Sequence, residues 1–197
     1  MRYLAAFTLA MLIAGIASSQ GRFGIKAGPV LNYINTKGEQ RGDYSELKTG
    51  FTIGVSYELL AGKNFGVQPE LNFIRLTSDE SISNSTLKMQ YVQIPVLLKG
   101  IANKGNFSVY AGPQLGFLTK ATMETPTGKS DYVKNLTETD FSAVIGFEYV
   151  TTLNITINAR YVHGMSNVLK VEYDTFKSRH QYAAFTVGYL FGRKNKQ

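Results

Sequence analysis

The sequence predicts an all-β fold, a single antiparallel up-and-down transmembrane β-barrel of about eight strands. Three observations lead to this prediction. After Gln20, apolar and polar residues alternate with a period of two, and turn residues separate the alternating segments. Most of these segments are eleven residues or longer, and a tilted strand needs about 9–11 residues to cross a bilayer. The connections are alternately short and long, which is typical of outer-membrane barrels.

The first 19 residues have the three-part form of a secretory signal peptide. Met1-Arg2 is a short positive start, and Leu4–Ala17 is an almost unbroken apolar run. Small residues then precede a cleavage site between Ser19 and Gln20. The alternative is a transmembrane anchor helix, but this apolar run is shorter than the ~20 residues that span a bilayer. We therefore predict a signal peptide at residues 1–19 and one barrel domain at residues 20–197.

Eight segments of the mature chain are predicted as strands. In chain order they run near Phe23–Ile34, Thr49–Leu60, Phe65–Thr77, Leu87–Gly100, Asn106–Thr119, Thr139–Val150, Leu153–Met165 and Gln181–Phe191. Short connections at residues 61–64, 101–105 and 151–152 alternate with longer polar stretches at 35–48, 78–86, 120–138 and 166–180. An even strand count places both termini on the short-turn side, which is periplasmic in outer-membrane barrels.

One face of these strands carries large apolar and aromatic side chains. In chain order this face comprises Phe51, Ile53, Val55, Tyr57, Leu59, Val92, Ile94, Val96, Leu98, Phe107, Val109, Ala111, Leu115, Phe117, Leu153, Ile155, Ile157, Ala159, Tyr161, Phe185, Val187, Tyr189 and Phe191. Its aromatic residues tend towards the strand ends, where interfacial girdles lie in membrane barrels. We expect this face to contact lipid.

The opposite face is rich in small residues. They are Gly24, Gly28, Gly54, Ser56, Ser108, Gly112, Gly116, Gly146 and Gly188. A soluble lipocalin-like barrel would turn its polar face to water and fill it with Lys and Glu. Glycines instead suit a narrow, crowded lumen, so we predict that this face points inward.

Six charged residues on the small face form an equal set of cations and anions. They are Lys26, Lys99 and Arg160 with Glu58, Glu70 and Glu148. Because an unpaired charge inside a narrow barrel is costly, we predict an internal network of salt bridges and hydrogen bonds. A proton path or a catalytic carboxylate pair is the alternative interpretation. Eight strands enclose little more than their own side chains, which favours a structural network.

Four prolines fall inside predicted strands, namely Pro29, Pro69, Pro95 and Pro113. Proline cannot donate to the backbone ladder, and a closed barrel has no free edge to place it on. We therefore expect β-bulges near Gln68-Pro69 and Ile94-Pro95.

The composition excludes several classes of protein. The chain of 197 residues has no cysteine, so it has no disulfide, thiolate metal site or lipoprotein anchor. Its net charge of +7 permits nucleic-acid binding. However, the positive residues are scattered apart from a cluster at Arg193, Lys194 and Lys196, so we expect no nucleic-acid partner.

No catalytic or metal-binding motif emerges. Thr127–Ser130 resembles the end of a phosphate-binding loop, but Met123 stands where the first glycine is required. The histidines, His163 and His180, do not form a metal-binding pair. The long polar stretches hold residue types used by hydrolases (Asp131, Asp140, Asp174, Ser178 and His180). Polar loops contain such residues by default, so we predict no enzyme activity and no cofactor.

Several separated motifs make a family resemblance. They are Gly24–Gly28, Phe65–Leu71, Val92–Lys99, Tyr110–Gly116 and Ala159–Tyr161. Together they resemble the outer-membrane β-barrel domain family of porin-like or PorT-type barrels, over nearly all of the mature chain. The resemblance implies an integral barrel of about eight strands without a cofactor, and no defined activity. The chain departs from the usual barrel end, because six residues follow the aromatic Phe191.

We therefore expect a non-enzymatic protein of the cell outer membrane that presents its long loops for structural, adhesion or partner-binding roles. The expected partners are outer-membrane lipids and a surface or envelope protein, and we expect a monomer. Three alternatives remain: an accessory role in transport or secretion, a lipid-modifying or proteolytic enzyme of the outer membrane, and a soluble lipocalin-like barrel that binds a ligand in the periplasm.

Overall fold

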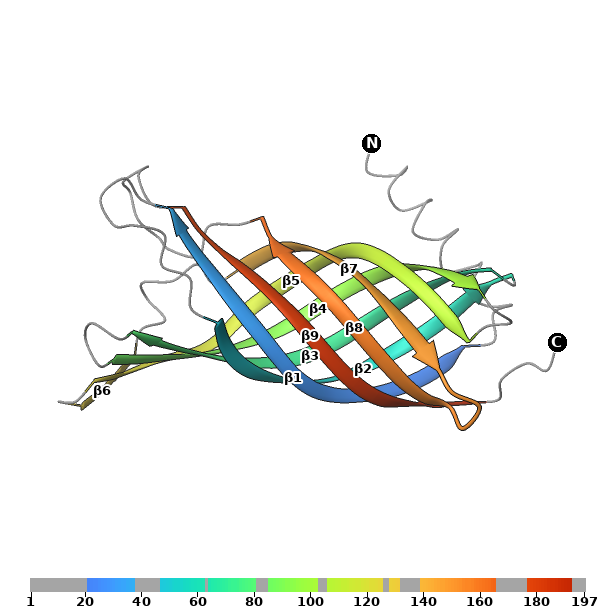
Figure 1. The fold of residues 1–197 in the computed structure, drawn as a ribbon, viewed down its shortest axis with the longest axis horizontal. Coiled ribbons are helices and arrows are strands. Elements are labelled where there is room, and N and C mark those ends of the chain that lie inside the picture. The colour runs from blue at the N-terminus through green and yellow to red at the C-terminus, as the bar shows by residue number, and fades with distance from the viewer. Residues whose placement is uncertain are drawn as a thin grey trace, which may run out of the picture.

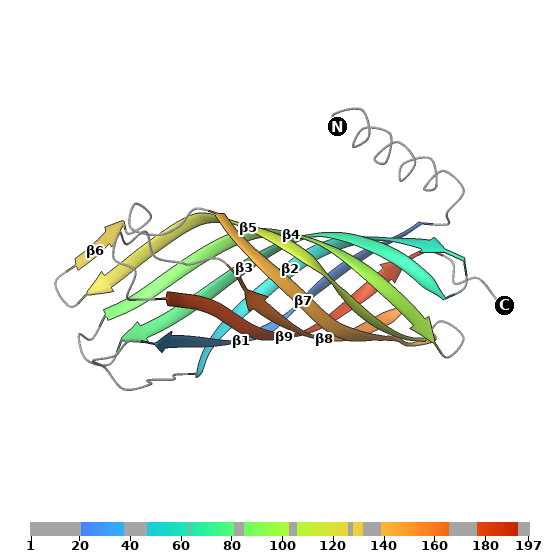
Figure 2. The ribbon, with the colours of Figure 1, turned by 90° about the horizontal axis from the view of Figure 1, so that it is seen from above.

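The computed structural model describes residues 21–37, 47–62, 64–80, 85–102, 106–125, 128–131, 139–165 and 177–192. They form an antiparallel sheet that closes into a barrel (Figures 1 and 2). The strands are β1 (Arg22–Lys37), β2 (Leu47–Ala61), β3 (Phe65–Glu80), β4 (Ser85–Ala102), β5 (Phe107–Thr125), β6 (Gly128–Asp131), β7 (Thr139–Val150), β8 (Ile155–Gly164) and β9 (Lys177–Phe191).

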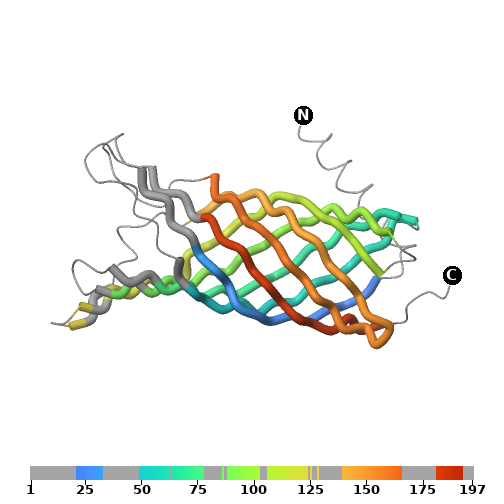
Figure 3. Tube along the Cα trace, viewed as in Figure 1, coloured from blue at the N-terminus to red at the C-terminus, as the bar shows by residue number. Residues whose placement is uncertain are grey.

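The strand order is that of an up-and-down barrel. The sheet runs β4-β3-β2-β1-β9-β8-β7-β5-β6, and pairing of β4 with β5 closes it. The eight long strands make the wall, whereas the short β6 pairs with Thr122–Thr125 at the far end of β5. The predicted fold of about eight antiparallel strands is thus confirmed. The trace in Figure 3 shows that the wall strands are inclined to the long axis of the barrel.

The two ends of the barrel differ. At one, here called the short-turn end, the start of β1 pairs with the end of β9, so that Phe23 lies opposite Phe191. The tight turn between β7 and β8 lies at the same end, because Leu190 N–H donates to Asn154 O at 3.0 Å. Asn154 adopts a left-handed φ of 62°, which Asn tolerates better than most residues. This turn also holds Leu153, so β8 begins two residues later than predicted, at Ile155.

At the opposite end, here called the long-loop end, strands continue into stretches predicted as polar connections. β3, β4 and β5 extend to Glu80, Ser85 and Thr125, and together with β6 they project beyond the rest of the wall (Figure 1). Likewise β9 begins at Lys177, so Ser178 and His180 lie on a strand and not in a loop. The extended parts of β3, β4 and β5 pair with one another and with β6. The start of β9 pairs with the end of β1.

The predicted bulges near Pro69 and Pro95 are wrong. In the β3–β4 ladder the register before the prolines (Pro69 opposite Val96) continues unchanged after them (Asn72 opposite Gln93). The prolines only interrupt the ladder locally, because their nitrogen has no proton to donate. The register shift that does occur lies between Gln90 and Tyr91 on β4.

Two Gly-Pro pairs show how the wall accommodates proline. A Cβ at Gly28 would lie 2.0 Å from the Phe185 carbonyl oxygen, and a Cβ at Gly112 would lie 2.0 Å from that of Val96. The ladder is interrupted at both places. Glycine therefore lets the neighbouring backbone approach closely beside each proline.

Several predictions concern residues outside the described ranges. They are the signal peptide with its cleavage site at Ser19 and Gln20, Asp174, and most of the long loops. Within the described part of the chain, no helix is long and apolar enough to cross a membrane.

Candidate functional site

The outer surface of the wall is a band of exposed apolar side chains. On β2, for example, Phe51, Ile53, Val55 and Tyr57 are exposed, while the residues between them are buried. The predicted outward face is therefore confirmed strand by strand. Exposed side chains of this size over a whole wall are what contact with lipid acyl chains requires.

Aromatic residues mark both margins of this band. At the short-turn end, Phe23 and Phe191 lie 6.0 Å apart between ring centroids, and Phe191 meets Tyr189 edge-on at 4.9 Å. Further exposed aromatics lie nearer the long-loop end, at Phe51, Phe73, Phe117, Phe141, Tyr161 and Phe185. Such girdles are found at the two interfaces of outer-membrane barrels.

Inside the barrel, a first ion cluster lies near the short-turn end. Lys99 Nζ donates to Glu58 Oε1 at 2.8 Å and to Glu148 Oε1 at 2.6 Å. Glu58 also forms a salt bridge with Arg22. Glu58 is 1% and Lys99 2% exposed, so these charges depend on one another rather than on water. Two cations thus face two carboxylates.

A second ion cluster lies beside the first. Glu70 Oε2 accepts from Arg160 Nη1 at 2.8 Å, and Lys26 forms a salt bridge with Oε1 of the same carboxylate. Asn158 accepts hydrogen bonds from Arg160 Nε at 3.4 Å and from the Tyr110 hydroxyl at 2.8 Å. Here one carboxylate faces two cations.

A single amide joins the two clusters. Gln68 Oε1 accepts from Lys99 at 2.8 Å, and Gln68 Nε2 donates to Glu70 at 2.7 Å. The structure thus places all six charged residues singled out in the sequence within one buried, connected network. It adds Arg22, which lies just before the first predicted strand.

Nearer the long-loop end the lumen becomes apolar, which the sequence did not predict. The buried cluster includes Val30, Ile74, Leu76, Met89, Tyr91, Leu118, Ala121, Val144 and Val162. Between the apolar and ionic parts, Tyr182 donates to Gln93 at 2.8 Å and accepts from Gln114 at 3.3 Å. The two ion clusters are therefore confined to one half of the barrel, whereas buried polar residues such as Asn32 and Ser142 also lie nearer the long-loop end.

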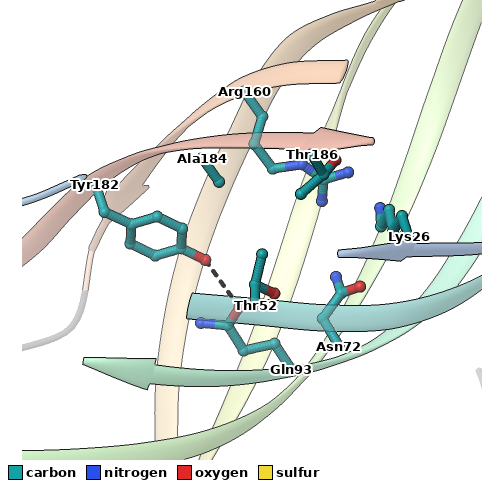
Figure 4. A pocket seen from close by; sticks show the side chains of 8 residues that line it. All are labelled: Lys26, Thr52, Asn72, Gln93, Arg160, Tyr182, Ala184 and Thr186. Atoms are coloured by element: carbon teal, nitrogen blue, oxygen red, sulfur yellow. Dashed lines mark hydrogen bonds between the residues drawn. The ribbon is translucent and has the colours of Figure 1, made fainter. Parts of the chain in front are cut away.

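A small void separates the second ion cluster from Tyr182 (Figure 4). Its volume is about 10 Å³, the space of about one water molecule. It is lined by Lys26, Thr52, Asn72, Gln93, Arg160, Tyr182, Ala184 and Thr186. Its size accommodates neither a substrate nor an ion pathway.

The residue types of a hydrolase are not assembled in the described part of the chain. The Asp140 carboxylate accepts from Ser142 at 2.7 Å on the inward side of β7. His163 lies half-buried on the outward side of β8, 6.4 Å from the Tyr161 ring. Asp131 is on β6, and Asp174 is outside the described residues. No group of three or more potential metal ligands occurs among the described residues.

Solved structures of outer-membrane proteins resemble this barrel. Among solved structures, the attachment invasion locus protein Ail of Yersinia pestis is similar, with a TM-score of 0.55 and 18% identity over 87% of this chain and 99% of Ail. Neisserial surface protein A is similar with a TM-score of 0.55 and 13% identity over 86% and 97% of the two chains. At these identities the likeness shows the fold alone.

The comparison with curated proteins gave no match. The profile of a family described as "outer membrane protein beta-barrel domain" matches residues 17–170, which include the lumen network and most of the wall. The chain belongs to this outer membrane protein beta-barrel domain family, and it is a protein of the cell outer membrane.

Proposed function

We propose that the protein is a non-enzymatic scaffold that presents its long-loop end to the cell exterior, where it binds a surface partner or an adhesion ligand. The observation that carries this proposal is the filled lumen. Ion pairs occupy the half near the short-turn end, and packed apolar side chains occupy the other half. A barrel filled in this way leaves its ends as the surfaces available for binding.

The projecting strands at the long-loop end support the same proposal. There β3, β4 and β5 continue past the apolar band, and β6 adds a further strand to β5 (Figure 2). Regular strands give a rigid base to the connections that they carry, and binding residues are often found on loops held by a rigid scaffold. Ail was crystallised with a heparin analogue, sucrose octasulfate, so a sulfated sugar is a reasonable first ligand to test.

The orientation can be tested with two epitope tags. One tag is inserted at residues 81–84, between β3 and β4 at the long-loop end. The matched control tag is inserted at residues 103–105, between β4 and β5 at the short-turn end. We expect antibody to label the first tag on intact cells and the second only after the outer membrane has been permeabilised. The reverse labelling would overturn the proposal.

The binding role needs a second measurement. Cells that display the protein are compared with cells in which the connections at residues 38–46 and 132–138 are replaced by short Gly-Ser linkers. We expect the parent cells to be retained on heparin-coated or host-cell surfaces at least several-fold more than the loop-replaced cells. Equal retention on every surface tested would contradict a role in adhesion, while the tags report orientation independently.

A further inference from the structure

The second ion cluster offers too few acceptors for its lysine. The Glu70 carboxylate accepts two hydrogen bonds from Arg160, at 2.8 and 3.2 Å. It accepts two more from side-chain amides, that of Gln68 at 2.7 Å and that of Asn72 at 3.0 Å. An ionised carboxylate has about four lone-pair sites, and an ammonium group carries three protons. Lys26 forms a salt bridge with this crowded carboxylate, so most of its ammonium protons need another acceptor.

Two buried oxygens near Lys26 also lack partners. Asn72 directs its amide nitrogen at Glu70, which leaves Oδ1 of the same side chain as an acceptor. Neither this oxygen nor Thr186 Oγ1, nor Lys26 Nζ itself, has a hydrogen-bond partner of good geometry in the described part of the chain. All three side chains are buried. Because buried polar groups in folded proteins are nearly always hydrogen-bonded, the three atoms indicate a ligand.

The three side chains meet at the void beside Tyr182. Lys26 on β1, Asn72 on β3 and Thr186 on β9 all line it (Figure 4). Lys26 and Asn72 belong to one row across the wall, with Gly54 of β2 between them. A Cβ on Gly54 would collide with Asn72 Oδ1, so this oxygen occupies space that the glycine leaves open. The void of about 10 Å³ has room for about one water molecule.

We propose that the void is a binding site for one structural water molecule, which accepts a hydrogen bond from Lys26 Nζ and donates to Asn72 Oδ1 and Thr186 Oγ1. Water fits because it both donates and accepts, and internal waters typically have about three polar partners. The second ion cluster disfavours a metal ion, because two cations already face one carboxylate there. The carbonyl oxygen of Asn72 disfavours an anion. The water ties β1, β3 and β9 together across the lumen.

A crystal structure of the folded protein, at a resolution that shows single waters, tests the site directly. We expect one isolated density peak within about 2.5–3.2 Å of Lys26 Nζ, Asn72 Oδ1 and Thr186 Oγ1. A void without density would overturn the proposal. Crystals grown in a bromide salt distinguish water from an anion, because bromide scatters anomalously. An anomalous peak in the void would overturn the proposal in favour of an anion site.

Alanine methyl groups provide a test in solution, with the folded protein in detergent micelles. Ala184 lines the void, whereas Ala121 lies in the apolar cluster. They are a matched pair, because Ala184 is 2% and Ala121 1% exposed. Nuclear Overhauser transfer from water should reach the Ala184 methyl several-fold more strongly than the Ala121 methyl. Equal transfer to both methyl groups would contradict a bound water.

The variant Lys26→Met tests what holds the water. It removes the ammonium protons and keeps a side chain of similar length, while Arg160 still pairs with Glu70. We expect the density peak to disappear and the transfer to Ala184 to fall several-fold. Transfer that stays at the parent level would have to come from exchanging hydroxyl protons, and the bound water would then have no support. The two measurements on the parent decide the proposal even if this variant does not fold.

Thr156→Val is the matched control for this variant. Thr156 is buried on the inward face of β8, opposite Gly188, and does not line the void. Its replacement removes a buried polar group from the same lumen without touching the three proposed ligands of the water. The density peak and the transfer to Ala184 should both stay within about twofold of the parent. Loss of both in this control would mean that the water depends on the lumen as a whole and not on Lys26.

Discussion

Lys99 connects three side chains of the lumen. Its ammonium group donates to two carboxylates and to the amide that leads to the second cluster. Glu58 forms salt bridges with two cations, Lys99 and Arg22. Glu148 forms a salt bridge with Lys99. The two carboxylates therefore depend on Lys99 to different degrees.

This asymmetry gives a prediction at the scale of the residue. Lys99→Met should lower the free energy of unfolding by about 3–5 kcal/mol, because it leaves buried carboxylate charge uncompensated. The double variant Lys99→Met with Glu148→Gln should recover at least about 1 kcal/mol of this loss, since Glu58 keeps its pairing with Arg22. Urea unfolding in lipid micelles, followed by far-UV circular dichroism, measures both values.

Leu98→Met is the matched control, because Leu98 is the outward neighbour of Lys99 and is 64% exposed. It should change the unfolding free energy by less than about 0.5 kcal/mol. If Lys99→Met were as stable as this control, the ion network would not contribute to holding the barrel together.

At the scale of the element, the Gly-Pro pairs are the described places where a Cβ added to glycine would come closest to neighbouring backbone. The chain offers two glycines on one strand, Gly112 and Gly116, in different surroundings. An added Cβ would lie 2.0 Å from the Val96 carbonyl oxygen at Gly112, but no closer than 3.5 Å to any atom at Gly116. The first contact is with backbone, which cannot move aside as a flexible side chain can.

Gly112→Ala should therefore destabilise the barrel by about 1–3 kcal/mol or more, as over-packing does. Gly116→Ala, on the same strand, should stay within about 0.5 kcal/mol of the parent. The mobility of unboiled samples on SDS gels over a temperature series compares the folded fractions. Equal melting of the two variants would mean that the ladder interruption beside Pro113 has room for a methyl group.

The elements also show what the sequence can predict. Period-two alternation identified every wall strand, and it identified the outward face of the five strands for which one was predicted, because lipid on one side and a crowded lumen on the other impose opposite residue types. The contrast disappears at the long-loop end, where inward Ile74 and Leu76 are as apolar as outward Phe73. The apolar half of the lumen and the extra strand length were missed there for that reason.

Two further errors have local causes. The bulge was expected at prolines, but it lies between Gln90 and Tyr91, where neither proline nor glycine marks it. Arg22 was missed because alternation starts only at Phe23, and its pairing with Glu58 depends on the register of β1 against the neighbouring β2, where the two residues lie opposite each other. Long-range contacts of this kind are not contained in the local pattern from which strands are predicted.

On the scale of the whole molecule, lumen and surface divide the charge between them. The described inward-facing cations (Arg22, Lys26, Lys99 and Arg160) are matched in number by inward-facing carboxylates (Glu58, Glu70, Asp140 and Glu148). Among the residues whose side chains the structure describes, the outward-facing charged residues are Arg75, Lys88 and Lys120. The described interior charges thus balance one another within the barrel.

A balanced and filled lumen predicts that the protein does not conduct ions. Eight strands enclose little more than their own side chains, the void beside Arg160 holds about 10 Å³, and packed apolar side chains fill much of the other half. In planar bilayers the purified protein should give no stable conductance steps, while a 16-stranded porin in the same bilayers should give open-channel steps. Reproducible steps from this protein would instead favour a role in transport, because the ion pairs would then have to line a path rather than close one.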